Sequence, residues 1–312
     1  MTNHSRRRWA FVVAVAVGAA ACGPAIGTIH TPTQVKLPNR PDSLRFAVIG
    51  DSGDLGDAQT AIAGLMAKYH ALFPFEFVLM AGDNTYDPAN TMAREFEGPF
   101  KTILEQKVPF FASLGNHDLN VDVQTRYEPF NMGGQQRYAF QKKNVDFFAL
   151  NSNRPDRAQL RWIDETIPAA KGSWKIVFFH HPLYSSGFHA QPATGGNEQQ
   201  SLRALWEPRL CTYGVDVVFS GHEHFYERIK PQHGITHFVT GASSKLRKGD
   251  ISTRASNGFT AAFNDVDFSF MLVEVTDAEL FFQTVTLTGE KLDEGVVRKI
   301  PREQRKCDPI TP

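Results

Sequence analysis

The chain has 312 residues, 42% of them hydrophobic, which is enough to build one large core or two small ones. It carries 33 basic and 33 acidic residues, so its formal net charge is zero. Composition therefore gives no support to a nucleic-acid-binding surface or a strongly basic membrane face, although it leaves room for a local cationic pocket that holds phosphate.

The first 22 residues have the pattern of an export signal. Three arginines, Arg6 to Arg8, precede a run of small and apolar residues that extends from Trp9 to Ala21 and is short for a membrane span. Ser5–Trp9 also resembles a twin-arginine signal, and an ordinary secretory signal explains these residues equally well. We expect export to the bacterial periplasm or cell envelope.

The three cysteines leave two questions open. Cys22 follows three alanines and precedes Gly23, which resembles a lipoprotein cleavage site with Ala in place of the usual Leu, so the protein is expected to carry a lipid anchor at Cys22 or to be cleaved without one. Cys211 and Cys307 would pair in an oxidising compartment or remain free thiols. Residues 23–42 are rich in Pro, Thr and Gly and predict a flexible tether.

From residue 44 onward, short apolar runs alternate with segments of helical spacing. The predicted strands are, in chain order, Leu44–Gly50, Phe75–Ala81, Val108–Leu114, Arg137–Gln141, Val145–Asn151, Trp174–His180 and Val215–Ser220. The predicted helices are Ala58–Tyr69, Met92–Gln106, Asp156–Ala170 and Ser201–Tyr213. Residues 119–135 contain few apolar side chains and are expected to form a surface excursion. This alternation indicates parallel strand–helix–strand units.

Beyond residue 220 the pattern changes to consecutive strands around a polar connection over residues 241–264. The strands expected there are Ile235–Thr240, Phe268–Thr276 and Ala278–Leu287. Parallel units followed by antiparallel strands indicate two mixed β-sheets, packed face to face and flanked by helices. We expect this α/β domain to cover residues 43–300, with a C-terminal tail over residues 301–312.

Five short segments place oxygen or imidazole donors at the ends of predicted strands. They are Asp51–Gly53, Gly82–Tyr86, Gly115–Asp118, Val177–His180 and Gly221–His224. Carboxylate, amide, phenol and imidazole groups are ligands for hard or borderline metal ions. Because ligand sites in α/β proteins form where strands end, the five segments together predict a site for two metal ions.

Two metal ions suit the hydrolysis of phosphate esters. The anionic ester oxygens repel a nucleophile, and a metal pair neutralises them, positions the phosphate and converts a bound water to hydroxide near neutral pH. One carboxylate has to bridge the ions, and Asp83 is the expected bridge. We therefore expect in-line attack by a metal-bound hydroxide, without a covalent phosphoenzyme.

The motif series resembles that of the calcineurin-like metallophosphoesterases over roughly residues 44–240, and within them that of the purple acid phosphatases. The common pattern begins with Asp-x-His and continues with Gly-Asp-x-x-Asp. Here Gly53 stands in place of the His, and Tyr86 in place of the second Asp. This paired exchange is typical of purple acid phosphatases, in which a tyrosinate replaces the histidine. The resemblance implies the four-layer metallophosphoesterase sandwich and an acidic pH optimum.

The resemblance, carried over residue by residue, implies two sets of metal ligands. The first set would hold ferric iron, and consists of Asp51, Asp83, Tyr86 and His224. The second set would hold zinc, manganese or ferrous iron, and consists of Asp83, Asn116, His180 and His222.

The resemblance also implies three catalytic residues beside the metals. His117 would contact phosphate or protonate the leaving group, Asp118 would orient the ring of His117, and His189 would contact the substrate. The expected protein is a monomeric phosphomonoesterase of the acid phosphatase type. Two alternatives stay open: a phosphodiesterase on the same two-metal site, and a lipid-anchored binding protein with a vestigial site.

Overall fold

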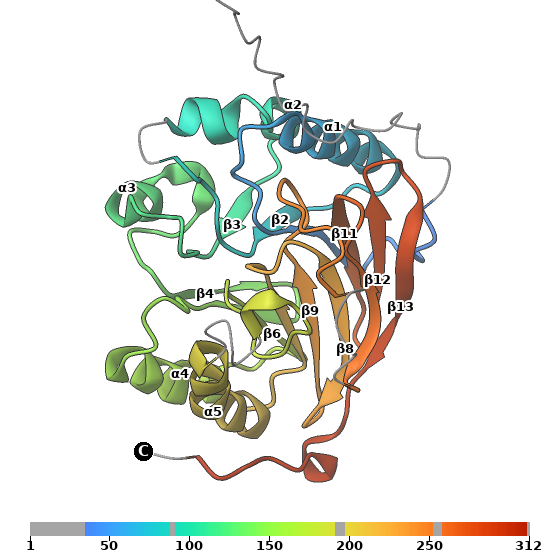
Figure 1. The fold of residues 1–312 in the computed structure, drawn as a ribbon. Helices are drawn as coiled ribbons and strands as arrows, with labels where there is room; N and C mark the ends of the chain where they lie inside the picture. Colours follow the sequence, from blue (N-terminus) through green and yellow to red (C-terminus); the bar gives the residue numbers. More distant parts are fainter. Residues whose placement is uncertain (1–34, 88–90, 191–196, 252–257, 311–312) are drawn as a thin grey trace, which may run out of the picture.

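Short strands build two mixed β-sheets that pack face to face in the computed structural model, which describes residues 35–87, 91–190, 197–251 and 258–310. Helices cover the outer sides of the sheets, so the domain has four layers (Figure 1). The predicted fold class, two mixed sheets flanked by helices, is confirmed.

The first sheet has six strands. They are β1 (Leu44–Ile49), β2 (Phe77–Met80), β3 (Phe110–Ala112), β11 (Ser269–Val275), β12 (Glu279–Thr286) and β13 (Lys291–Arg298). Their order across the sheet is β13-β12-β11-β1-β2-β3. β1, β2 and β3 run parallel, so their carboxyl ends meet at one edge, whereas β11, β12 and β13 pair antiparallel.

The second sheet has seven strands. They are β4 (Tyr138–Lys142), β5 (Val145–Ala149), β6 (Trp174–Phe178), β7 (Val217–Ser220), β8 (Tyr226–Gln232), β9 (Ile235–Thr240) and β10 (Thr260–Asn264). Their order is β10-β8-β9-β7-β6-β5-β4. β5, β6, β7 and β9 are parallel, and the other three strands pair antiparallel with their neighbours.

Helices complete the outer layers. They are α1 (Asp57–Leu72), α2 (Lys101–Glu105), α3 (Val121–Arg126), α4 (Arg157–Ala169) and α5 (Asn197–Thr212). In Figure 1, α1 and α2 lie at the top of the view and α4 and α5 at the bottom, with the sheets between them. Tyr69 of α1 meets Phe270 of β11 edge to face, and Trp206 of α5 meets Phe179 after β6 in the same way.

The core between the sheets is rich in phenylalanine. Phe46 of β1 stacks on Phe77 of β2, with 5.1 Å between the ring centroids. The same ring meets Phe147 of β5 and Phe219 of β7 edge to face, at 5.5 and 6.1 Å. Each such aromatic pair is worth about 0.5–1.5 kcal/mol beyond its burial, so this cluster joins the two sheets.

Three strands and two helical segments differ from the sequence prediction. β8 and β13 were not expected, because their sequences are largely polar, and β10 falls in the connection over residues 241–264; β10 and β13 lie at sheet edges, where one side faces solvent. Residues 119–135, expected to be a surface excursion, contain α3 and the buried side chains of Phe130 and Met132. The predicted helix Met92–Gln106 is divided at Gly98-Pro99 into a π-helical turn, Ala93–Glu97, and α2. A proline has no backbone N–H to continue the ladder.

The amino-terminal predictions fall largely on residues 1–34, which include the export signal and Cys22 and lie outside the described residues. The last part of the predicted tether, residues 35–42, is fixed to the domain. Leu37 is buried in the core, and the backbone N–H groups of Asn39 and Arg40 donate to the carboxylate of Glu274 at 2.6 and 2.7 Å. The packed domain therefore begins before residue 43.

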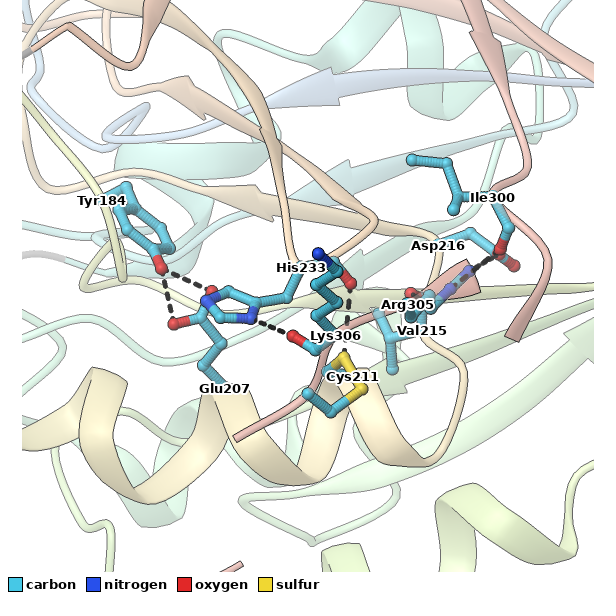
Figure 2. Close-up of a disulfide and its surroundings, with 10 residues drawn as sticks. Tyr184, Glu207, Cys211, Val215, Asp216, His233, Ile300, Arg305 and Lys306 are labelled. Carbon is cyan, nitrogen blue, oxygen red and sulfur yellow. Dashed lines mark hydrogen bonds and ion pairs between the residues drawn. A yellow bond between two sulfur atoms is a disulfide. The ribbon is translucent and has the colours of Figure 1, made fainter. Parts of the chain in front are cut away.

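The C-terminal tail is fixed to the second sheet and α5. Cys211 and Cys307 form a disulfide with 5.6 Å between their Cα atoms, which resolves the alternative that the sequence left open (Figure 2). Arg305 Nη2 donates to Asp216 Oδ1 at 2.7 Å, and both side chains are nearly fully buried. In the part of the chain that the structure describes, no helix has the length and apolar character needed to cross a membrane.

Candidate metal centre

The predicted metal ligands lie on loops that follow five strands. Asp51 follows β1, Asp83 and Tyr86 follow β2, Asn116 follows β3, His180 follows β6, and His222 and His224 follow β7. Backbone pairing continues into these loops: Asp51 N donates to Gly82 O, and Gly221 N donates to His180 O, each at 3.0 Å. Backbone hydrogen bonds alone therefore hold these loops against one another.

Three of these residues have a left-handed backbone. φ is 52° at Asp51, 51° at Asp83 and 69° at His222. This conformation costs a non-glycine residue on the order of 1–3 kcal/mol and persists where the surrounding structure enforces it. The motif glycines instead allow close approach, because a Cβ on Gly115 would overlap Asp83 Oδ1, and one on Gly221 would overlap Asp51 Oδ2.

The first group of side chains brings together a phenol, a carboxylate and an imidazole. Tyr86 Oη lies 3.1 Å from Asp51 Oδ1 and 3.5 Å from His224 Nε2. His224 Nε2 lies 3.5 Å from the same Asp51 oxygen. Three potential ligand atoms therefore form a triangle, as the first predicted ligand set requires.

The second group brings together an amide and two imidazoles. Asn116 Oδ1 lies 3.0 Å from both His180 Nε2 and His222 Nδ1, and the two nitrogens are 3.2 Å apart. His180 Nδ1 lies 3.0 Å from the Ala81 carbonyl oxygen, to which it donates. That hydrogen bond fixes the ring with His180 Nε2 directed at the group, the orientation usual for histidines that bind metal ions.

Asp83 lies between the two groups. Its Oδ2 is 3.3 Å from His180 Nε2, and its carboxylate also interacts with the hydroxyl of Tyr86. Its other oxygen, Oδ1, accepts the backbone N–H of His117 at 2.9 Å. Asp51 divides its oxygens in the same way, because its Oδ2 accepts the backbone N–H of His222 at 2.8 Å. Each carboxylate is anchored through one oxygen and offers the other.

The charge balance of the cluster fits a bound cation. Asp51 and Asp83 are 0% and 1% exposed, and among the described residues neither pairs with Lys or Arg. Burial and the two carboxylates raise the pKa of Tyr86 above its usual range. Burial disfavours the charged form of His180, but Asp83 and Asp51 outweigh it and raise its pKa to about 10. Buried negative charge of this kind calls for metal ions, and the oxygen and imidazole donors suit them.

His117 and Asp118 lie in different surroundings, one exposed and one buried. His117 is exposed, and its ring centroid lies 4.6 Å from that of Tyr86, beside the first group. Asp118 is buried, and its carboxylate accepts the backbone N–H groups of Gly115, Asn84 and Thr85 at 2.7, 2.9 and 3.0 Å. Asp118 therefore ties the loop after β3 to the loop after β2, and its expected role in orienting the His117 ring stays a prediction.

A cavity of about 450 Å³ opens beside the second group. Its lining includes Asn116, His181, His189, His222 and Glu223, together with Pro155, Pro182 and Leu202. The predicted residue His189 is thus brought to the site, with its ring centroid 4.4 Å from that of His222.

Glu223 and Arg247 hold His189 in the cavity wall, and no sequence pattern pointed to either. His189 Nδ1 lies 3.2 Å from Oε2 of the fully buried Glu223. Arg247 Nη1 lies 3.4 Å from His189 Nδ1 and 3.9 Å from the same Glu223 oxygen. The carboxylate and the guanidinium therefore fix the position of the imidazole.

His181 and Ser152 form a second contact in the cavity wall that sequence reasoning missed. Ser152 Oγ lies 2.9 Å from His181 Nδ1 and 3.0 Å from the backbone nitrogen of His181. Burial and the neighbouring His180 lower the pKa of His181 to about 3, so this ring is neutral. The adjacent pair His180-His181 was the available signal, because two consecutive residues can face two parts of one site.

A family model of the calcineurin-like phosphoesterases matches residues 44–226, more than half of the chain. The chain belongs to this family. The matched residues include all five ligand-bearing loops described above. In this phosphoesterase, the buried carboxylates and histidines at the strand ends form a possible metal-binding group. Together with the family match, this group supports the function of a hydrolase.

The phosphoesterase is similar in sequence to acid phosphatases. It is 27% identical over 296 residues to purple acid phosphatase 17 of Arabidopsis thaliana, covering 82% of this chain and 85% of that protein. It is 24% identical over 310 residues to human tartrate-resistant acid phosphatase type 5, covering 84% and 92%.

Solved structures share the fold of this phosphoesterase at low sequence identity. GAP50, described as the anchor in the inner membrane complex of Plasmodium, matches with a TM-score of 0.67 and 19% identity over 84% of this chain and 90% of that one. The purple acid phosphatase PPD1 from yellow lupin seeds matches with a TM-score of 0.64 and 16% identity over 87% and 56%. One of these neighbours is named as a phosphatase and the other as an anchor, so the fold alone does not decide the activity.

Proposed function

We propose that this phosphoesterase hydrolyses phosphomonoesters at a pair of metal ions, as a phosphatase of the purple acid type. The observation that carries the proposal is the position of Tyr86, whose hydroxyl lies 3.1 Å from Asp51 and 3.5 Å from His224. A phenol there supplies the donor that Gly53 lacks. The similarity to purple and tartrate-resistant acid phosphatases supports the same conclusion.

The two groups of side chains would hold one ion each, with Asp83 shared. Asp51, Asp83, Tyr86 and His224 would hold ferric iron, because a phenolate is a hard donor; Asp83, Asn116, His180 and His222 would hold zinc, manganese or ferrous iron. Bound ions would neutralise the phosphate and provide hydroxide from water near neutral pH for in-line attack.

The remaining polar residues would bind and orient the ester. His117 lies on the Tyr86 side and His189 on the cavity side, so the two imidazoles can contact different oxygens of one phosphate. Glu223 and Arg247 keep His189 in place. Asp118 holds the loops that carry Asp83 and Asn116 at a fixed separation.

We also propose that the protein acts outside the cytoplasm as a monomer, in the periplasm or cell envelope. The signal-like residues 1–22 support export, and Cys22 is the candidate lipid attachment point. The disulfide between Cys211 and Cys307 supports an oxidising compartment.

One preparation tests the proposed function. The protein purified without chelator should contain two metal ions, show a pink to violet colour and hydrolyse p-nitrophenyl phosphate faster than its bis ester. Tyr86→Phe should lose the colour, since the colour arises from the tyrosinate on iron. Turnover of the bis ester alone would instead support a phosphodiesterase on this site, and a colourless, metal-free and inert protein would support a binding role.

A further inference from the structure

His181 is a cavity histidine that neither ligand set uses. Its ring centroid lies 4.3 Å from that of His222, and the next residue along the chain is Pro182. The cavity lining combines the ligand candidates Asn116 and His222 with the apolar side chains of Pro155, Pro182 and Leu202. A phosphate that reaches the ligands would leave its alcohol portion against the apolar side chains. His181 lines this cavity beside both kinds of side chain.

The contacts of Ser152 allow a tautomer of His181 that carries its proton on Nε2. The backbone N–H of His181 can only donate, so Ser152 Oγ accepts it at 3.0 Å. Ser152 Oγ also lies 2.9 Å from His181 Nδ1, and either of the two atoms can be the donor. Where Ser152 donates its hydroxyl proton to Nδ1, the neutral ring carries its own proton on Nε2.

The tautomer decides whether His181 can act as a metal ligand. One ligand atom each of His180, His181 and His222 lie within 4.8 Å of one another, which would permit a site of three imidazoles. In the tautomer with a proton on Nε2, that nitrogen has no lone pair for a metal ion. Ser152 contacts the other ring nitrogen, Nδ1, and the His181 side chain lines the cavity, so an Nε2–H would be a hydrogen-bond donor there.

We propose that the Nε2–H of His181 donates a hydrogen bond to the ester oxygen of a bound phosphomonoester; this inference rests on the proposed function. When the bond between phosphorus and the ester oxygen breaks, that oxygen keeps the electron pair. The hydrogen bond stabilises the charge that develops there, and the departing alkoxide takes its proton from solvent, so His181 retains its own. A fixed donor aimed at developing charge contributes a factor of about 10²–10³ in rate. His181 thereby favours substrates with a basic leaving group.

Two variants of His181 distinguish the effect of its N–H donor from the effect of its ring shape. His181→Phe keeps a ring against His222 and removes the donor, whereas His181→Gln keeps an N–H and removes the ring. With phenyl phosphate, whose leaving group is basic, kcat/KM should fall about 10²-fold in His181→Phe. It should fall much less with p-nitrophenyl phosphate, whose leaving group needs less help. His181→Gln should recover part of the loss, and bound metal should equal that of the wild type in both variants.

The opposite results are equally distinct. Equal losses on the two esters, or no recovery in His181→Gln, would overturn the donor role, and loss of bound metal in both variants would identify His181 as a ligand. A wild-type protein that hydrolyses neither ester would overturn the proposed function and this inference with it. A wild-type protein that hydrolyses both, with unchanged His181→Phe kinetics, would overturn this inference alone.

The tautomer can be measured without activity. In the full chain loaded with zinc, which is diamagnetic, nitrogen NMR should assign the His181 ring, through the signal that disappears in His181→Phe, as protonated on Nε2 and not on Nδ1. Ser152→Ala should shift the ring toward the Nδ1–H form. A wild-type ring protonated at Nδ1 would contradict the assignment.

Discussion

The two sheets contribute different chemistry to the candidate site. The loops of the six-stranded sheet, after β1, β2 and β3, supply the oxygen donors Asp51, Asp83, Tyr86 and Asn116. The loops of the seven-stranded sheet, after β6 and β7, supply the imidazoles His180, His222 and His224. Neither sheet carries a complete ligand set, so the site exists only when the sheets are packed together.

Because each sheet supplies only part of the ligands, packing of the core and binding of metal ions are coupled. The contact of Asp83 with His180, at 3.3 Å, joins the two sheets at the site, and the rings around Phe46 join them in the interior. Metal ions that bridge the sheets would stabilise the packed state by mass action, and the packed state would raise metal affinity.

Asp83→Ala should have the largest effect, because it removes the oxygen donor that touches both groups. We expect loss of both metal ions and a fall in kcat greater than the roughly 100-fold typical of losing a residue that only supports a ligand. Metal analysis and p-nitrophenyl phosphate turnover measure the two losses. Asp42→Asn, a substitution of an exposed aspartate, is the control. An Asp83→Ala protein that keeps both ions would show that Asp83 is not a ligand shared by the two groups.

Phe46→Ala should weaken the junction of the sheets without touching a ligand. Loss of a buried phenylalanine side chain costs about 3–5 kcal/mol of unfolding free energy, measured by urea titration. Phe263→Ala, at a site 44% exposed on β10, should change it by about 0.5 kcal/mol or less. We also expect weaker metal retention in Phe46→Ala, and retention equal to that of the control would show that core and site are uncoupled.

The double variant Cys211→Ser, Cys307→Ser should affect the imidazole-bearing sheet alone. Removing the disulfide should lower the unfolding free energy by about 2–4 kcal/mol. Metal content and kcat should stay at wild-type values, because the bond fixes the tail to α5 and not the ligand loops. Reduction of the wild type should reproduce the change in stability, whereas a loss of metal on reduction would show that the tail supports the site.

His189→Ala should have the smallest effect among the site residues. His189 lies on the imidazole side but in the cavity wall, held by Glu223. We expect both metals to remain and kcat to fall about tenfold, equivalent to about 1.4 kcal/mol. Steady-state kinetics and metal analysis decide this, and unchanged kinetics would remove His189 from the site.

The sequence predicted the parts of the site that depend on local signals. An apolar strand that ends in Gly-Asp or Gly-His brings a ligand to a sheet edge, and all seven predicted ligands lie in two adjoining groups. The contacts of Asp118 with the loop after β2 were not predicted, because the direction of a side chain within a turn does not follow from spacing. Ser152 meets His181 across 29 residues of chain, and Cys211 meets Cys307 across 96, so no local pattern reports either contact.

Strand periodicity does not report contacts where the backbone leaves the strand. His222 has φ of 69°, and Glu223 Oε2 lies 3.2 Å from His189 Nδ1, a contact that alternation along a strand does not predict. Polar edge strands such as β13 escaped detection because the apolar alternation on which the prediction depends is weak in them.

The left-handed backbone at Asp51, Asp83 and His222 has an evolutionary consequence. Selection for ligation has to maintain a side chain there against a steric penalty that glycine does not incur. A descendant released from that selection should drift toward glycine or asparagine at these three positions, and gain folding free energy as it does so. Such a replacement would be a sequence-level mark of a relative that keeps the architecture as a scaffold and has abandoned catalysis.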